Sequence, residues 1–297
     1  MELVIQAQRR SLGGFEVGRV LPSAGRRMVG PFVFFDHMGP ATFPPNIPQD
    51  ADVRPHPHIG LATITYLLNG EITHRDSLGA DQPIRPGEVN WMTAGRGITH
   101  SERFEGMRTA GGLMDGIQSW VALPEANEEA DPAFDHYPQA DLPAWGEAGL
   151  AGRLIAGTAF GLTSEVKTFS PLFYVHLRLQ PGARFGLPTG HAERAVYVTT
   201  GRIEAEGRTF EPGHMLAFAA GETPALQAIE PSDVMLLGGE PLGPRHVWWN
   251  FVSSSRERIE QAKADWRAGR FALPPHDDRE FIPLPDEPPR PQANPMS

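Results

Sequence analysis

Two short groups of residues in the amino-terminal part of the chain carry side chains of the types that serve as metal ligands in proteins. They are His56-Pro57-His58 and His100-Ser101-Glu102. Side chains of an extended strand alternate between its two faces, so His56 and His58 point the same way, as do His100 and Glu102. If the two strands lie side by side, three imidazoles and one carboxylate converge. We therefore predict a metal site formed by His56, His58, His100 and Glu102.

This ligand set suits Fe(II), Mn(II), Ni(II), Co(II), Cu(II) or Zn(II), and geometry and availability choose among these ions. An octahedral ion held by four protein ligands keeps two positions open for a substrate oxygen and a second small ligand, unlike a closed structural zinc site. The chain has no cysteine, which excludes thiolate zinc sites, cysteine-bound iron–sulfur clusters, disulfides and a cysteine nucleophile. Two alternatives to a catalytic metal site remain. The four residues could form a site that binds metal without catalysis, or they could be unrelated polar residues.

The segment that joins the two groups has the pattern of a β-meander. Residues 61–68 are rich in β-branched and aromatic side chains and end at Asn69-Gly70, a dipeptide that favours a tight hairpin turn. Further strands are expected at 72–76 and 89–93, and turns at 78–81 and 86–88. This recurrence of strands and turns, at intervals of roughly 8–12 residues, predicts an all-β antiparallel sandwich or barrel.

The second half of the chain repeats this rhythm. Tyr66-Leu-Leu-Asn-Gly70 resembles Tyr197-Val-Thr-Thr-Gly201, and Pro86-Gly87 resembles Pro212-Gly213. Such self-similarity predicts two structurally related halves. In this alignment Leu187 and Thr189 replace His56 and His58, and Leu226 and Ala228 replace His100 and Glu102. The second half therefore has the scaffold without the ligands. Its expected strands are 151–156, 172–179, 195–199, 203–206, 215–219 and 234–237.

We expect an amino-terminal metal-binding domain at 1–135, a linker at 136–150 and a carboxyl-terminal domain without metal ligands at 151–297. Within the last domain, serines followed by Ile259, Ala262 and Trp266 at helical spacing predict a short amphipathic helix that ends near Gly269. The proline-rich tail after it, from 273 to 297, should be extended or partly disordered.

The charge and hydropathy of the chain limit its partners. The 297 residues carry a formal net charge of −10, so they give no electrostatic footprint for direct nucleic-acid binding. No apolar run reaches the roughly 18 residues that span a bilayer, and the amino terminus lacks the order of a signal peptide. We therefore expect a cytoplasmic protein without membrane contact, and the bias towards arginine, alanine, glycine and proline indicates a bacterial source.

Several long motifs resemble those of the pirin family, whose members are bicupin metalloproteins. The motifs are Gly30–Pro40, Pro55–Gly60, Gly70–Gly79 and Trp91–Glu102. The resemblance implies two cupin barrels in tandem and a monomer. It also implies iron, as Fe(II), or another divalent metal in the amino-terminal barrel, held by His56, His58, His100 and Glu102. Ordinary cupins often take a carboxylate four or five residues after the second histidine; Ala62 and Thr63 stand there, so Glu102 supplies it.

Some pirins are similar to quercetin 2,3-dioxygenases, which implies O₂-dependent ring opening of a flavonol or a related enolic aromatic. Glu102 would then be the catalytic base that takes the substrate hydroxyl proton. The resemblance equally implies an alternative from another class. In it, a non-catalytic metal-bound protein regulates a partner, as a transcriptional co-regulator or as a modulator of a metabolic enzyme such as pyruvate dehydrogenase. The loop 103–112 would change with the state of the metal.

The apolar and polar residues expected around a flat substrate are less specific. We place Phe34, Asp36, Trp91, Met92 and Gln118 at the substrate pocket, with core packing as the alternative for the apolar ones. Trp120 lies on the same strand face as Gln118. Asp36-His37 could support a metal ligand or hydrogen-bond to backbone. His74 is interpreted as a strand-face residue without a role in the site.

Overall fold

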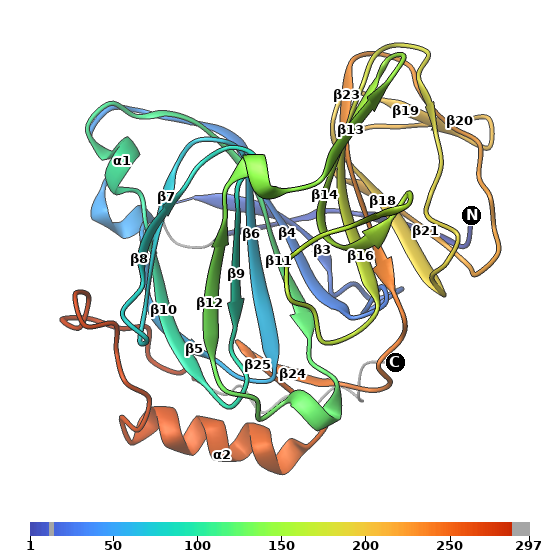
Figure 1. Ribbon diagram of the computed structural model, residues 1–297. Helices are drawn as coiled ribbons and strands as arrows, with labels where there is room; N and C mark the ends of the chain where they lie inside the picture. The colour runs from blue at the N-terminus through green and yellow to red at the C-terminus, as the bar shows by residue number, and fades with distance from the viewer. Residues whose placement is uncertain (12–14, 287–297) are drawn as a thin grey trace. The chain divides into compact units, whose positions relative to one another are not determined.

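The computed structural model describes residues 1–11 and 15–286, and strands dominate it (Figure 1). Contacts divide the chain into two compact units. The histidine unit comprises 38–136 and 243–286, with 10–11 and 15–17. The apolar unit comprises 1–9, 18–37 and 137–242. Each unit is therefore assembled from segments that are far apart in the sequence.

The histidine unit is built around a four-stranded sheet with the order β5-β10-β7-β8. These strands are β5 (Val53–His58), β10 (Ile98–Arg103), β7 (Ile72–Asp76) and β8 (Asp81–Ile84). A seven-stranded sheet has the order β12-β9-β6-β11-β4-β3-β2; its residues 8–9, 18–21, 32–37 and 137 are grouped with the apolar unit and the others with the histidine unit. Its strands are β12 (Ala133–Tyr137), β9 (Val89–Thr93), β6 (Leu61–Asn69), β11 (Gly112–Ala122), β4 (Phe32–Phe43), β3 (Glu16–Leu21) and β2 (Gln8–Ser11).

The turn at Asn69-Gly70 differs from the predicted hairpin. Gly70 has the positive φ of 92° that the dipeptide predicts. However, β6 pairs with β9 and β11, whereas β7 pairs with β8 and β10. The turn therefore carries the chain from one sheet to the other. Local propensity predicts the turn correctly, but the pairing partners depend on residues distant in the sequence.

The apolar unit repeats the same pattern of strands. Its four-stranded sheet has the order β17-β22-β19-β20, with β17 (Arg184–Phe185), β22 (Leu226–Ala228), β19 (Ile203–Ala205) and β20 (Arg208–Phe210). The larger sheet has the order β1-β21-β18-β23-β16-β14-β13, and β15 pairs with β14. Its strands are β1 (Leu3–Gln6), β21 (His214–Phe218), β18 (Glu193–Thr200), β23 (Ser232–Gly239), β16 (Leu172–Leu179), β14 (Leu150–Ala159), β13 (Ala144–Glu147) and β15 (Leu162–Thr163).

The repeated topology supports the duplication inferred from the sequence. The order β9-β6-β11-β4-β3 in one larger sheet corresponds to β21-β18-β23-β16-β14 in the other, and the two four-stranded sheets also correspond. Two packed antiparallel sheets bury their inner faces against each other, which is why both units need alternating apolar positions. The core of the apolar unit consists of residues such as Leu154, Phe173, Val196 and Leu236, all fully buried.

The compact units divide the chain differently from the boundaries expected at 1–135 and 151–297. Residues 243–286 belong with the histidine unit. The segment 136–150, expected as a linker, contains β13, which pairs with β14. Sequential boundaries miss this arrangement because strand pairing, not chain order, determines which segments share contacts.

The helix predicted after residue 253 is α2 (Arg256–Arg267), and Gly269 follows it with a positive φ of 67°. The Ser255 hydroxyl caps it by accepting from the Arg258 backbone N–H. Its apolar face packs on a hairpin of β24 (His246–Trp248) and β25 (Phe251–Ser253), where Phe251 is in the same cluster as Ile259 and Trp266. The remaining helical segments are η1 (Gln49–Ala51), α1 (Glu105–Arg108), η2 (Glu125–Asn127) and η3 (Gln139–Asp141).

The tail after α2 lies partly within the described residues. Its residues to 286 run largely without helix or strand, and the rest of the predicted tail, 287–297, lies outside the description. The tail is fixed to the histidine unit: the Ile282 N–H donates to the Pro55 carbonyl at 2.8 Å, and the Trp266 indole N–H donates to the Ile282 carbonyl at 3.0 Å. Within the described residues, no helix has the length and apolar character needed to cross a bilayer.

Candidate metal centre

The strands β5 and β10 bring the predicted ligands together. In their antiparallel register His100 lies opposite His56, and Ile98 lies opposite His58. On its other side, β10 pairs with β7, so that His100 lies opposite Asp76 and Glu102 opposite His74. Residues directly opposite each other in a sheet share a face. The four predicted ligands, His74 and Asp76 therefore project from one face of this sheet.

The three histidines form a compact buried group. One ring nitrogen from each of His56, His58 and His100 lies within 4.8 Å of the others, and all three side chains are buried. The Nε2 atoms of His58 and His100 are 3.1 Å apart. This geometry fits imidazole ligands directed at a common point.

The outer ring nitrogens of His56 and His58 bond to backbone carbonyls. His56 Nδ1 lies 2.9 Å from the Arg54 carbonyl, and His58 Nδ1 lies 3.1 Å from the Asn250 carbonyl. A carbonyl can only accept a hydrogen bond, so the network assigns the proton of each neutral ring to Nδ1. Each Nε2 then carries a lone pair.

A similar argument assigns the proton of His100. Asp76 is fully buried and accepts from the N–H groups of Leu78 and Ala80, and its other oxygen lies 2.9 Å from His74 Nε2. His74 Nε2 therefore donates to the carboxylate, which leaves His74 Nδ1 as an acceptor. His100 Nδ1, 3.3 Å away, donates to it. His100 Nε2 is thus also unprotonated, and carboxylate–histidine pairs of this kind orient ligands in many metal sites.

The donor set fits a divalent cation. Burial lowers the pKa of His56 to about 4 and the pKa values of His58 and His100 well below their ordinary value, so the rings are neutral at physiological pH. Three lone pairs pointing at one place repel one another unless a cation lies between them. Neutral imidazoles held in this way are the form that binds transition metals.

Glu102 follows His100 on the same strand face and is half-buried. Burial raises the pKa of its carboxyl to about 7. Among the described residues, the group with ligand atoms within 4.8 Å contains the three histidines and not Glu102. Its role as the fourth ligand stays a prediction.

Residues predicted at the substrate pocket lie in different places. Trp120 approaches the centre directly, with its ring centroid 5.1 Å from that of His58. Trp120 and Met92 both lie opposite Thr63, so they share a face of the larger sheet. Gln118 shares this face and accepts from the Thr65 hydroxyl at 2.7 Å. Trp91, next to Met92, projects from the opposite face.

The other two predicted pocket residues are on β4. Both Asp36 carboxylate oxygens accept from Arg19, each at 2.8 Å, and the Arg19 guanidinium lies 4.5 Å from the centre of the Phe34 ring. By contacts these residues belong to the apolar unit. Asp36 is therefore satisfied by an ion pair there, and the pocket role of both residues stays a prediction.

His74, interpreted from the sequence as a strand-face residue without a role in the site, and Asp76 both support His100. The signal that could have found them is the spacing of two on a predicted strand, the same spacing that revealed the ligands. The ring of His74 is also stacked on Phe134, with centroids 4.2 Å apart. This contact fixes the plane in which His74 meets His100.

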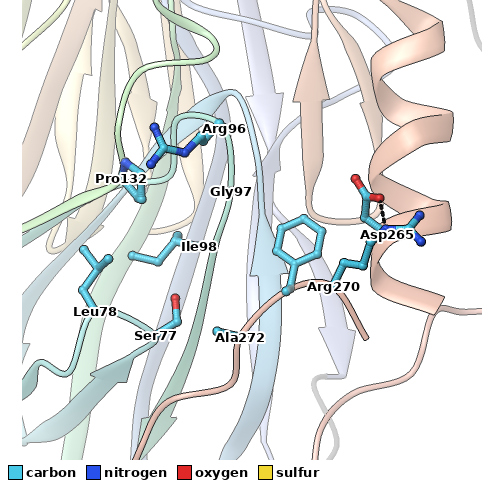
Figure 2. Close-up of a pocket in the computed structure, with 10 residues that line it drawn as sticks. Ser77, Leu78, Arg96, Gly97, Ile98, Pro132, Asp265, Arg270 and Ala272 are labelled. Atoms are coloured by element: carbon cyan, nitrogen blue, oxygen red, sulfur yellow. Dashed lines mark hydrogen bonds and ion pairs between the residues drawn. The ribbon is translucent and has the colours of Figure 1, made fainter. Parts of the chain in front are cut away.

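A surface pocket of about 410 Å³ lies elsewhere in the histidine unit (Figure 2). Its lining contains no predicted ligand and comprises Ser77, Leu78, Arg96, Gly97, Ile98, Pro132, Asp265, Arg270, Phe271 and Ala272. Arg270 is paired with Asp265 and Arg96 with Asp131. Each of its two arginines is therefore paired with a carboxylate, and none of the three clustered histidines lines it.

Fold and site together define a protein of two cupin units, in which one unit has a histidine-lined interior and the other an apolar one. The family model of Pirin matches residues 14–121, and that of the Pirin C-terminal cupin domain matches residues 174–272. The chain belongs to the pirin family, as the resemblance implied. Its all-β tandem cupin fold with a short carboxyl-terminal helix is thereby confirmed.

Known relatives cover almost the whole chain. A "Pirin-like protein" of Caulobacter vibrioides is 61% identical over 287 residues, which make up 96% of this chain and 100% of that protein. A Pseudomonas aeruginosa protein named "Putative quercetin 2,3-dioxygenase" is 40% identical, over 86% of this chain and 80% of its own. The crystal structure of quercetin 2,3-dioxygenase from Acinetobacter baumannii has a TM-score of 0.90 and 32% identity, covering 99% of this chain and 98% of that one.

Proposed function

We propose that the protein is a metal-dependent dioxygenase that opens the ring of a flavonol or a related enolic aromatic with O₂. The observation that carries the proposal is the convergence of three unprotonated imidazole nitrogens, from a sheet face that also carries Glu102. The relatives named for quercetin 2,3-dioxygenase activity support the choice of substrate. Fe(II) is the proposed ion, and Mn(II), Ni(II), Co(II), Cu(II) and Zn(II) suit the same ligands.

His56, His58 and His100 would hold the ion, with Glu102 as the fourth ligand. When bound, the ion supplies a Lewis acid that lowers the pKa of a coordinated hydroxyl group, together with a position for O₂. His74 and Asp76 keep the His100 ring in the tautomer that presents Nε2 inward.

Glu102 has the properties of a general base. Its carboxyl has a pKa of about 7 in the absence of an ion, and a cation held by the three histidines would lower this pKa and keep the carboxylate deprotonated and able to accept a proton. We propose that it takes the hydroxyl proton of the substrate. We propose that a flat aromatic molecule binds against the sheet face that carries Trp120 and Met92. Gln118, which accepts a hydrogen bond from Thr65, lies on the same face.

Turnover of quercetin under air and under anaerobic conditions tests the proposal. We expect O₂-dependent loss of the flavonol absorbance, release of carbon monoxide, and loss of both after metal removal. Glu102→Gln should lower kcat about 100-fold, in the range of general-base catalysis. Glu102→Gln turnover equal to that of the wild type, or no metal-dependent turnover at all, would contradict it.

The alternative is a metal-dependent binding protein that regulates a partner protein. The observation that favours it is the short connection between a candidate ligand and the protein surface. The exposed residues Glu105 and Gly106 of α1 follow Glu102 by only three and four positions. Capture of partners from the native lysate by metal-free and metal-loaded protein separates the two functions. Identical partners for both forms would exclude this alternative.

A further inference from the structure

Two residues of the ligand strand face away from the metal centre and are nevertheless buried. Ser101 lies between His100 and Glu102, and Arg103 follows Glu102, so strand alternation turns both to the opposite face of β10. Their exposed fractions are 0% and 6%. Such polar residues on an outer face are buried only when another segment covers them.

Asp277 in the tail after α2 covers both residues. Its carboxylate accepts from the Ser101 hydroxyl at 2.6 Å and from Arg103 at 2.7 Å and 2.6 Å. Charge-assisted bonds in this two-pronged geometry are among the strongest hydrogen bonds in proteins. The hydrogen bonds from Arg103 and Ser101 overcome the effect of burial and hold the pKa of Asp277 below its usual range, so it is ionised at neutral pH.

The tail also reaches the second ligand strand. The Ile282 N–H donates to the Pro55 carbonyl, next to His56, and the Ile282 carbonyl accepts from the Trp266 indole. The ring of Phe281 packs edge-on against Trp266 with centroids 5.5 Å apart. The tail is thus attached to β10 at one point, to β5 at another, and to α2. Figure 1 shows it leaving the end of α2 on the side of β5 and β10.

These two attachments meet at an irregularity in the ligand sheet. His100 lies opposite His56, but Glu102 lies opposite Val53, so β5 has one residue more than β10 in this interval. The bulge places Arg54 and Pro55 opposite Ser101. Bulges re-aim side chains beside functional sites. Here the tail binds the bulge from both strands, through Ser101 on β10 and Pro55 on β5.

We propose that Asp277 is a positioning residue, which holds the bulge so that the Glu102 carboxylate is directed at the metal. The inference rests on the metal-holding part of the proposed function and not on its chemistry. A protein that binds the ion normally but does not turn over quercetin would count against the dioxygenase and leave the role of Asp277 intact.

Titration of the metal-free full-length protein with Co(II) tests this role, because visible Co(II) absorption depends on the ligands of the ion. Asp277→Asn should weaken Co(II) binding about tenfold, as is typical when a residue supporting a ligand is lost, and shift the spectrum towards that of Glu102→Gln. Asp278→Asn is the matched control. Asp278 is exposed, and its substitution removes the same charge one residue away from Asp277. It should bind like the wild type.

The double variant separates positioning from general stabilisation. If Asp277 acts through Glu102, adding Asp277→Asn to Glu102→Gln should change Co(II) affinity less than threefold. Full additivity, or a wild-type spectrum in Asp277→Asn, would overturn the proposal. If the Asp277→Asn variant does not fold, Ser101→Ala serves as the test, because it removes one of the three hydrogen bonds that the Asp277 carboxylate accepts. A Co(II) spectrum and affinity unchanged from the wild type in this variant would also overturn the proposal.

Discussion

The two units have the same strand order but opposite interiors. Taking Leu226 as the counterpart of His100, strand register makes Phe185 and Leu187 the counterparts of His56 and His58, and Ala228 that of Glu102. All four belong to the apolar core of their unit. One copy of the scaffold therefore has a polar interior suited to holding an ion, while the other uses the same positions for hydrophobic stabilisation.

The residues opposite the candidate ligands on the neighbouring strand differ between the two units in the same way. Asp76 lies opposite His100, and Ala205 lies opposite Leu226; His74 lies opposite Glu102, and Ile203 lies opposite Ala228. The polar residues are thus replaced as a set, and this set includes His74 and Asp76. A buried histidine or aspartate without its partners would be costly, so partial replacement is unfavourable.

This register also corrects the alignment made from the sequence. The turn glycines placed Leu187 and Thr189 at the positions of His56 and His58, two residues away from the counterparts defined by strand pairing. The reason is a difference in the connection: His56 precedes Gly70 by 14 residues, whereas its counterpart Phe185 precedes Gly201 by 16. Turn motifs therefore mark the repeat but not its register.

The largest effect should come from removing one histidine. His100→Ala deletes one of three converging nitrogens, so we expect purified protein to lose most of its bound metal while the apolar unit remains folded. Elemental analysis measures the metal content, and circular dichroism measures the retained fold. Full metal content in His100→Ala would refute the idea that the polar interior is a metal site.

The matching change in the apolar unit should act on stability alone. Leu226→Ala leaves a cavity where the other unit has a ligand, and such changes lower the free energy of unfolding by about 2–5 kcal/mol. Urea unfolding measures the loss, and metal content should stay at the wild-type value. A fall in metal content without a loss of stability would break the comparison.

An intermediate effect is expected at His74. Replacing it with alanine removes the acceptor that fixes the His100 tautomer, and we expect metal affinity to fall about 10–100-fold. Competition with a chelator measures the affinity. Wild-type affinity in His74→Ala would mean that the residue belongs to packing, as first interpreted from the sequence.

The smallest effect should be a dependence on pH. The raised pKa of Glu102 means that the carboxyl is protonated below about pH 7 in the metal-free protein, and binding must then release one proton. Metal affinity should rise about fivefold between pH 6 and pH 7 and level off above pH 7, since the histidines are already neutral.

The control for this prediction is Glu102→Gln, which has no carboxyl to deprotonate. Its affinity should be nearly constant over the same range. An identical slope in both proteins, measured by chelator competition, would assign the proton to another group.

The types and spacing of the candidate ligands, the all-β fold and the apolar second copy all follow from the amino-acid sequence. These features depend on alternation within single strands and on the order of turns, which neighbouring residues encode. His56 and His58 could be placed on one face for this reason alone, whereas their approach to His100 depends on the pairing of β5 with β10.

The contacts between residues that are distant in the chain depend on tertiary structure. It linked His100 to His74 and Asp76, separated the faces of Trp91 and Trp120, and brought Asp277 to the back of the ligand strand. Pairing across a sheet and docking of a tail depend on partners far away in the chain, and a local pattern contains no information about those partners.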